Sequence, residues 1–214
     1  MSNVFITGGT GYMGRHLIPV LLKCGLQIRA LVRAGSESKL APGCEPVLGD
    51  ALDANSYARK VPPSDTFVQL VGTPKPNPRK AQQFRDVDYK SGMPAVAAAK
   101  QAGVRHLVYV SVAHPAPIMQ AYIQPRIDVE DAIHKNSLNA TILRPWYVLG
   151  PGHYWPYLIM SGYWIMGLIP SKSDAVNRLG FVTLKQMIGA LVHAIESPTQ
   201  GIKIMEVPEI RRYP

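Results

Sequence analysis

The chain has 214 residues, 47% hydrophobic and 17% charged, a composition typical of a globular protein and not of a disordered one. Its formal net charge is +9 at pH 7, but the lysines and arginines are scattered and no basic stripe is interleaved with aromatic residues, so nucleic-acid binding is not expected. No signal peptide, membrane span or metal-ligand spacing is found, and Cys24 and Cys44 are expected to be free thiols in a cytoplasmic protein.

The apolar pattern alternates between strand and helix along the whole chain. Strands are predicted at residues 3–7, 27–33, 45–48, 66–71, 106–111, 139–143 and 203–207, and helices at 12–24, 55–59, 81–102, 126–135 and 184–195. Strands separated by helices pair in parallel and carry helices on both faces. The sequence therefore predicts a single α/β domain over residues 1–214, a doubly wound parallel sheet of the Rossmann type.

The first strand runs into a glycine-rich turn that opens a helix. This is the arrangement that binds the pyrophosphate of a dinucleotide. Gly9 or Gly11 lets the backbone approach the phosphates, Gly14 lets the helix pack close to the strand, and the helix N-terminus offers unpaired N–H groups. The predicted phosphate-binding residues are Thr7, Gly8, Gly9, Thr10, Gly11, Tyr12, Met13 and Gly14.

Arg33 follows the second strand, where NAD-specific sites usually carry an acidic residue that binds the ribose hydroxyls. Arginine cannot accept hydrogen bonds from hydroxyls, but it can hold a 2′-phosphate with two charge-assisted bonds. Ser36, Ser38 and Lys39 could complete that pocket. The pattern favours NADP as the cofactor, with NAD as the alternative.

The carboxyl ends of parallel strands meet at one edge of the sheet, where ligands bind. This topology brings further residues to the glycine turn. Asp50 and Ala51 follow the third strand and are expected near the adenine. Val71 ends the fourth strand and Gly72 and Thr73 follow it, and all three are also assigned to the cofactor, whereas Ser111 ends the fifth strand.

Several motifs carry a resemblance to a known family. They are Thr7-Gly8-x-x-Gly11-x-x-Gly14, Gly49-Asp50, Val87-Asp88-Tyr89, the runs 98–104, 107–111 and 141–145, and Gly150-Pro151-Gly152. In this order they resemble the short-chain dehydrogenase/reductase superfamily, most closely its atypical, NmrA-like NAD(P)H-binding group. The resemblance covers nearly the whole chain and implies a Rossmann fold and a dinucleotide cofactor. Pro145, within one of these motifs, is assigned to the cofactor as well.

The same resemblance implies a catalytic serine and a Tyr-x-x-x-Lys motif. Ser111 fits the serine, and Tyr122 fits the tyrosine, but Arg126 replaces the lysine. Arginine keeps the charge and could depress the pKa of the tyrosine, although it does not lose its proton in proteins. Pro125 predicts that the helix begins near it, with Tyr122 just outside and its i, i+4 pairing with Arg126 loose or absent. In that case Tyr122 would only line the substrate pocket or pack in a loop.

An aromatic segment at residues 145–180 holds all three tryptophans and is predicted to be a small C-terminal substrate cap. His114, Trp146, His153 and Trp155 are the predicted substrate-facing residues, and either histidine is an alternative proton donor. Such a wall suits an apolar or aromatic substrate. The alternatives for this segment are a homodimer or partner interface, contact with a membrane surface, and plain core packing.

The sequence thus predicts an NADP(H)-binding oxidoreductase. A hydride would pass between the nicotinamide and a small carbonyl, enone, quinone or flavin acceptor, which Ser111 and Tyr122 would polarise. A non-catalytic NADP-binding regulator or complex-assembly subunit is the alternative. A nucleotide-sugar epimerase or dehydratase is disfavoured, because the chain leaves little room after Arg144 for a separate substrate domain.

Overall fold

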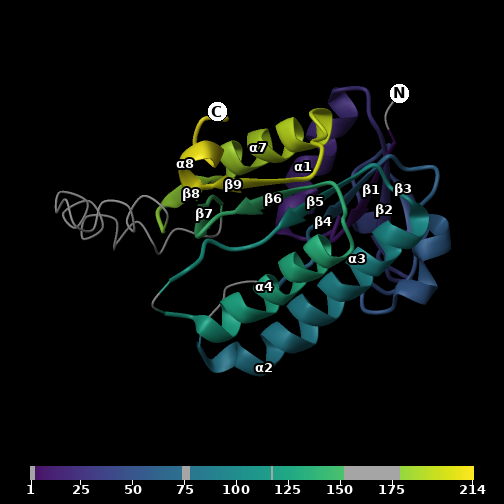
Figure 1. The fold of residues 1–214 in the computed structure, drawn as a ribbon. Helices are drawn as coiled ribbons and strands as arrows, with labels where there is room; N and C mark the ends of the chain where they lie inside the picture. Colours follow the sequence, from purple (N-terminus) through teal and green to yellow (C-terminus); the bar gives the residue numbers. More distant parts are fainter. Residues whose placement is uncertain (1–2, 74–77, 117, 152–178) are drawn as a thin grey trace.

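A computed structural model describes residues 3–73, 78–116, 118–151 and 179–214. Seven strands form one parallel sheet in the order β3-β2-β1-β4-β5-β6-β9 (Figure 1). The strands are β1 (Asn3–Thr7), β2 (Gln27–Val32), β3 (Glu45–Leu48), β4 (Thr66–Gln69), β5 (His106–Val110), β6 (Ala140–Arg144) and β9 (Ile202–Glu206). The predicted α/β class and parallel sheet are confirmed.

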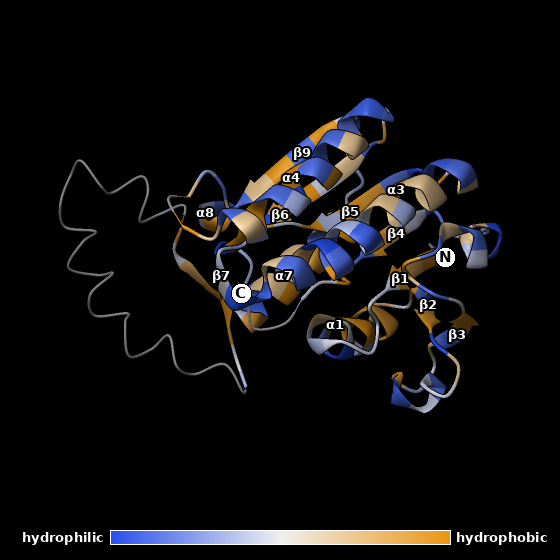
Figure 2. Ribbon diagram, turned by 90° about the horizontal axis from the view of Figure 1, so that it is seen from below, coloured by the Kyte–Doolittle hydropathy of each residue, from blue (hydrophilic) through white to orange (hydrophobic). Residues whose placement is uncertain are grey.

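Helices cover both faces of the sheet. Helices α1 (Tyr12–Lys23) and α7 (Leu184–Glu196) lie on one face, and α3 (Lys90–Ala102) and α4 (Gln120–Lys135) lie on the other (Figure 1). Strand β1 shows why both faces need cover, because Val4 and Ile6 belong to the core beneath α1 and α7, whereas Phe5 belongs to the other core. Figure 2 shows both hydrophobic and hydrophilic residues along these helices, as amphipathic packing requires.

Three strands begin where predicted but end earlier, at Val32, Gln69 and Val110. The register explains the end of β4. Thr7 is the last residue of β1, and it pairs with Leu31 on one side and Gln69 on the other, so β4 has no partner in β1 beyond that point. Consequently Arg33, Val71 and Ser111 stand in the loops just past the strands, where residues are free to face a ligand. Strand β6 is shifted one residue later than its predicted range, and β9 is shifted one residue earlier.

The predicted helix at 81–102 is not uniform. It consists of a short turn α2 (Ala81–Gln83), a π-helical segment at Phe84–Tyr89 and α3, which Gly103 ends with a left-handed backbone at φ +64°. At the end of the π-helical segment the Lys90 N–H donates to the carbonyl of Arg85, five residues earlier. Asp88 lies within this wide turn and is 3% exposed, so its carboxylate is placed inside the protein.

The prediction that the helix after Ser111 begins near Pro125 is wrong. Helix α4 begins at Gln120, and the Met119 carbonyl accepts hydrogen bonds from the N–H groups of Tyr122 and Ile123. Buried packing of Ile123 against Val112 and Ala116 fixes this first turn. Tertiary contacts therefore outweigh the local preference of proline for a helix start, and Tyr122 is part of the helix.

The remaining elements are short. The predicted helix at 55–59 is two 3₁₀ turns, Ala54–Ser56 and Ala58–Lys60, and further 3₁₀ turns lie at Glu37–Lys39 and Pro78–Lys80. A second, two-stranded parallel sheet of β7 (Tyr147–Leu149) and β8 (Phe181–Thr183) and a short α8 (Val207–Ile210) were not predicted. Within the described ranges, none of the helices is long and apolar enough to cross a membrane.

Candidate functional site

A cavity of about 650 Å³ opens where the strands of the large sheet end. It brings together loops that follow β1, β2, β3, β4, β5 and β6, as the topology predicts. Its lining consists of Gly8, Thr10, Gly11, Tyr12, Met13, Leu31, Val32, Arg33, Ser36, Lys39, Gly49, Asp50, Ala51, Leu52, Leu70, Val71, Gly72, Thr73, Val87, Val110, Ser111, Tyr122, Arg126, Pro145, Trp146, Tyr147 and Val148.

The glycine turn forms one wall of this cavity, and its geometry requires glycine. Gly8 has a φ of +77°, and a Cβ there would lie 2.9 Å from backbone atoms of Leu70 and Val71. At Gly14 a Cβ would lie 2.4 Å from the Gly9 carbonyl oxygen, so only glycine lets α1 pack this close to the turn. Gly11 caps α1 without a side-chain hydrogen bond, and the first turn carries no acidic residue. This open helix N-terminus fits an anionic phosphate group.

The end of the cavity beyond β2 carries basic and hydroxyl groups. Arg33 and Lys39 are exposed there, and Ser36 beside them is half-buried. In the part of the chain that the structure describes, no acidic side chain forms an ion pair with Arg33. Asp50 also lines this end, and its Oδ1 accepts a hydrogen bond from the Leu52 N–H at 3.0 Å. The arrangement suits a phosphate ester with a nucleoside beside it.

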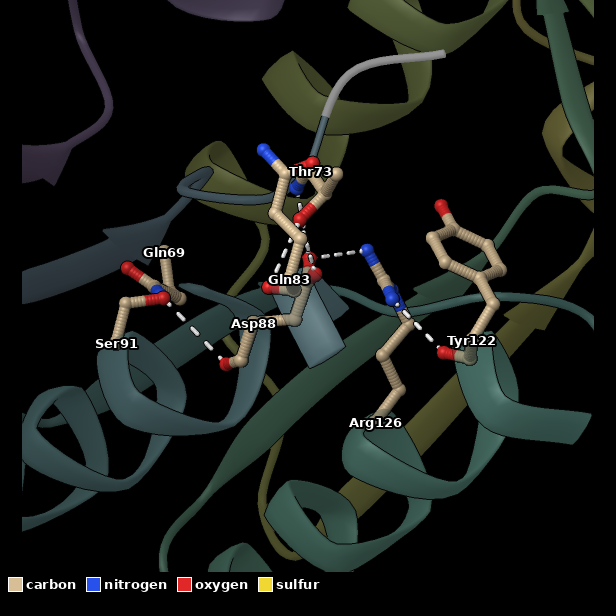
Figure 3. Close-up of polar contacts among 7 residues, drawn as sticks. All are labelled: Gln69, Thr73, Gln83, Asp88, Ser91, Tyr122 and Arg126. Carbon is tan, nitrogen blue, oxygen red and sulfur yellow. Dashed lines mark hydrogen bonds and ion pairs between the residues drawn. The ribbon is translucent and has the colours of Figure 1, made fainter. Parts of the chain in front are cut away.

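A buried ion pair lies at the opposite end of the cavity. Arg126 Nη2 donates to Asp88 Oδ1 at 2.6 Å, and Arg126 Nη1 donates to the Tyr122 carbonyl at 2.9 Å. Asp88 also accepts from the backbone N–H and the hydroxyl of Thr73, at 2.9 and 2.6 Å. Figure 3 shows Arg126 between Asp88 and Tyr122. The two charges of the pair thus face each other, and both oxygens of Asp88 accept hydrogen bonds.

The side chains of Tyr122 and Arg126 do pair across one helical turn, contrary to the expectation from Pro125. The Arg126 Cζ atom lies 3.8 Å from the centroid of the Tyr122 ring, which also packs edge-on against Phe84. Burial raises the pKa of the Tyr122 phenol, Arg126 lowers it and Asp88 raises it, with burial the largest influence. Arg126 thus lowers the phenol pKa as expected, but burial outweighs it and the pKa rises overall, so Tyr122 is a neutral hydrogen-bond donor.

Ser111 belongs to a second buried network. Its hydroxyl donates to the Glu130 carboxylate, which also accepts a hydrogen bond from Nε of Arg144 at 3.2 Å and a short one from its Nη2. His114 Nε2 lies within 3.5 Å of the same carboxylate. Glu130 is 4% exposed and Ser111 is equally buried. The hydrogen bond to Glu130 therefore holds the Ser111 side chain in place.

Most of the residues predicted for the site line the cavity, but several do not. Gly9 and Gly14 act in packing, and Thr7 is buried within β1, where its hydroxyl contacts Gln69. His114 contacts Glu130 and is not part of the cavity wall. His153 and Trp155 lie outside the described residues, as does most of the predicted cap. Roles in catalysis and binding remain predictions for all of them.

Sequence reasoning assigned no role to Asp88, Glu130 and Arg144, which build the two polar networks. Asp88 stood within a recognised motif, yet nothing in the pattern indicates its partner. Glu130 had a usable signal, because Tyr122, Arg126 and Glu130 are spaced by four and lie on one face of a helix. Because the helix was predicted to begin near Pro125, Tyr122 was placed outside it and this spacing was not recognised.

Comparison with known proteins agrees with this geometry. Residues 8–152 match the model of an NAD(P)H-binding family. The chain is 27% identical over 211 residues to ceramide reductase of Caulobacter vibrioides, covering 98% of this chain and 65% of the reductase. It is 24% identical to photosystem II assembly factor Ycf39 of Trieres chinensis, covering 66% of this chain and 44% of that protein.

The fold also matches that of the Bordetella bronchiseptica enzyme WbmH in complex with NAD+. The TM-score is 0.71 at 20% identity, covering 96% of this chain and 75% of that one, and at this identity the match concerns the fold. The predicted NAD(P)H-binding family is confirmed by the family model, and the predicted Rossmann fold is confirmed by this structural match. With the glycine turn and cavity described above, the chain belongs to the NAD(P)H-binding family.

Proposed function

We propose that this protein is an NADP(H)-dependent oxidoreductase acting on an apolar carbonyl compound or the corresponding alcohol. The observation that carries the proposal is a single cavity that joins the glycine turn to Ser111 and Tyr122. A dinucleotide bound along the turn would thus have polar side chains at the far end of the same cavity. The similarity to ceramide reductase supports a reductive reaction.

Arg33 supports NADP over NAD. Its guanidinium lies at the cavity end beyond β2, without an acidic partner in the described ranges, and Lys39 and Ser36 line the same end. Residues of this kind bind a 2′-phosphate through charge-assisted hydrogen bonds. An acidic residue that would favour the ribose hydroxyls of NAD does not stand at that position.

The opposite end would hold the hydride acceptor. When bound, the nicotinamide group supplies or accepts the hydride. Val87, Val110 and Trp146 give this part of the wall an apolar character, which suits an apolar skeleton. The Tyr122 phenol is proposed to donate its proton to the carbonyl oxygen, and Arg126 holds the phenol in place through its ring.

Two measurements test the proposal. Calorimetric titration with NADPH and with NADH should give binding of NADPH that is tighter by about tenfold or more, about 1.4 kcal/mol. NADPH oxidation should then be followed with a panel of apolar ketones and quinones, comparing the wild type with Tyr122→Phe. Loss of turnover in the variant supports the proton-donor role. Unchanged turnover excludes it, and binding of neither cofactor refutes the proposed function.

A cofactor-binding assembly factor is a second candidate function. The similarity to Ycf39 supports it, and so does the arginine at position 126, which cannot relay protons as lysine can. This candidate predicts NADPH binding without turnover of any acceptor in the panel. The same experiment therefore separates the two functions.

A further inference from the structure

The Ser111 hydroxyl has only one proton, and that proton is already engaged. Ser111 Oγ donates to Oε1 of Glu130. A hydroxyl group has one O–H donor and two acceptor lone pairs. A serine that donates to a carboxylate can therefore only accept hydrogen bonds from other groups. At the wall of the cavity, Ser111 thus differs from a serine that is free to donate to a carbonyl oxygen.

Glu130 cannot act as the hydrogen-bond donor in its contact with Ser111. The Arg144 guanidinium donates to both of its oxygens, with Nε at 3.2 Å from Oε1, and His114 Nε2 lies 3.5 Å from Oε2. A carboxylate held by a guanidinium fork is an acceptor, and it has no proton to return to the serine. Arg144 is itself held, because its Nη1 lies 3.7 Å from Glu206.

The hydroxyl groups of Tyr122 and Ser111, which line this end of the cavity beside Arg126, are therefore complementary. Tyr122 is a neutral phenol that can donate, and Ser111 is a hydroxyl that can only accept. A ligand that satisfies both must carry an acceptor, such as a carbonyl oxygen, near an O–H or N–H donor. A simple ketone would leave the Ser111 lone pairs buried without a partner, which weakens binding.

We propose that Glu130 is a positioning residue that makes Ser111 a hydrogen-bond acceptor, and that the substrate carries a hydroxyl or amide N–H next to its reacting carbonyl. This inference rests on the proposed function only in treating the bound ligand as a substrate. The selectivity itself is a property of ligand binding and is measured without turnover.

The test compares two ketones of the same skeleton. Phenacyl alcohol carries a hydroxyl beside its carbonyl, and acetophenone lacks it. Each is titrated calorimetrically into the 214-residue protein without added cofactor, so that neither carbonyl is reduced and the hydroxyl of phenacyl alcohol is not oxidised. Phenacyl alcohol should bind the wild type about tenfold more tightly than acetophenone, about 1.4 kcal/mol.

Two variants test whether the preference for phenacyl alcohol depends on Ser111 and Glu130. Ser111→Ala removes the acceptor and leaves Glu130 bound to Arg144, and Glu130→Met frees the serine proton. Both should reduce the ratio of the two affinities to about one. A merely structural role would weaken both ligands alike and leave the ratio unchanged. Glu206→Met is the matched control, since Glu206 also contacts Arg144 but is 39% exposed in its side chain, and the Ser111 hydroxyl donates to Glu130 instead.

The outcomes separate this inference from the proposed function. Equal binding of the two ketones to the wild type, binding of neither, or a preference that survives in Ser111→Ala overturns the inference. If the preference is present and depends on Ser111, the inference stands even where NADPH oxidation is absent with every acceptor. In that case the oxidoreductase proposal alone fails.

Discussion

The Arg126 guanidinium carbon lies 3.8 Å from the centroid of the Tyr122 ring, one helical turn earlier in α4. The same guanidinium forms an ion pair with Asp88, and the two side chains of the pair are only 6% and 2% exposed. Arg126 therefore contacts the Tyr122 ring and the Asp88 carboxylate with the same guanidinium group. Its replacement affects stability as well as the geometry of the cavity.

Arg126→Met should lower the free energy of unfolding by about 3–5 kcal/mol, because it leaves the buried Asp88 carboxylate without a charged partner. Urea denaturation measures this change. Adding Asp88→Asn to the variant should restore part of the loss, since the uncompensated charge is then gone. A double variant no more stable than Arg126→Met would contradict the ion-pair interpretation.

Arg33→Ala should weaken NADPH binding by about tenfold or more and leave NADH binding nearly unchanged, because only NADPH carries the 2′-phosphate. Calorimetric titration of both cofactors measures the two affinities. Arg59→Ala is the matched control, since Arg59 is an exposed arginine that does not line the cavity. An equal loss for NADPH and NADH would place Arg33 away from the 2′-phosphate.

Gly8→Ala should destabilise the protein more than Gly25→Ala and should also abolish NADPH binding. The two glycines have nearly the same φ, +77° and +79°, so the strain of a left-handed alanine, about 1–2 kcal/mol, is common to both. A Cβ at Gly25 meets nothing within 4 Å, whereas one at Gly8 would clash with the backbone of Leu70 and Val71. Thermal unfolding of the two variants isolates the clash, and equal losses would rule it out.

The protein should lose stability as the pH falls from about 6.5 to 4, through His106. Burial lowers the pKa of this histidine from 6.5 to about 4, and its Nε2 lies 3.0 Å from the Thr141 hydroxyl. The unfolded chain then binds a proton that the folded chain does not, so the stability present above pH 6.5 is lost on acidification, by about 3 kcal/mol.

Urea denaturation across this pH range checks the His106 prediction. His106→Leu should flatten the dependence on pH, because the folded and unfolded chains no longer differ at that position. His16→Leu, at an exposed histidine, is the control. A wild-type stability that is constant between pH 6.5 and 4 would show that His106 is not the group that titrates.

Strand positions and the glycine turn could be predicted because their signals are local. Buried parallel strands such as β1 are continuous apolar runs, and the bounds predicted for β1 and β3 are those observed. The glycine positions at 8 and 14 follow from backbone contacts that any such turn must make. These features depend on few residues close together in the chain.

The helix start at Gln120 and the polar networks could not be predicted, because they depend on residues far apart in the chain. The first turn of α4 is fixed by packing against Val112 and Ala116, which outweighs the signal of Pro125. Likewise Glu130 meets Arg144 and Ser111 only after β5 and β6 have paired. A residue pattern indicates which groups share a helix face, but not which partner another element brings to it.

The order of strands in the sheet has a consequence for biogenesis. Strand β1 lies between β2 and β4, and the Gly8 turn is completed by the backbone at Leu70 and Val71, so the nucleotide motif is synthesised long before its enclosing wall. Parallel pairing across such separations forms slowly, after loop-closure entropy has been overcome. A nascent chain emerging from the ribosome thus contains the glycine turn before Leu70 and Val71 can complete the cofactor cavity. Cofactor is then able to stabilise only chains in which β4 and β5 have joined the sheet.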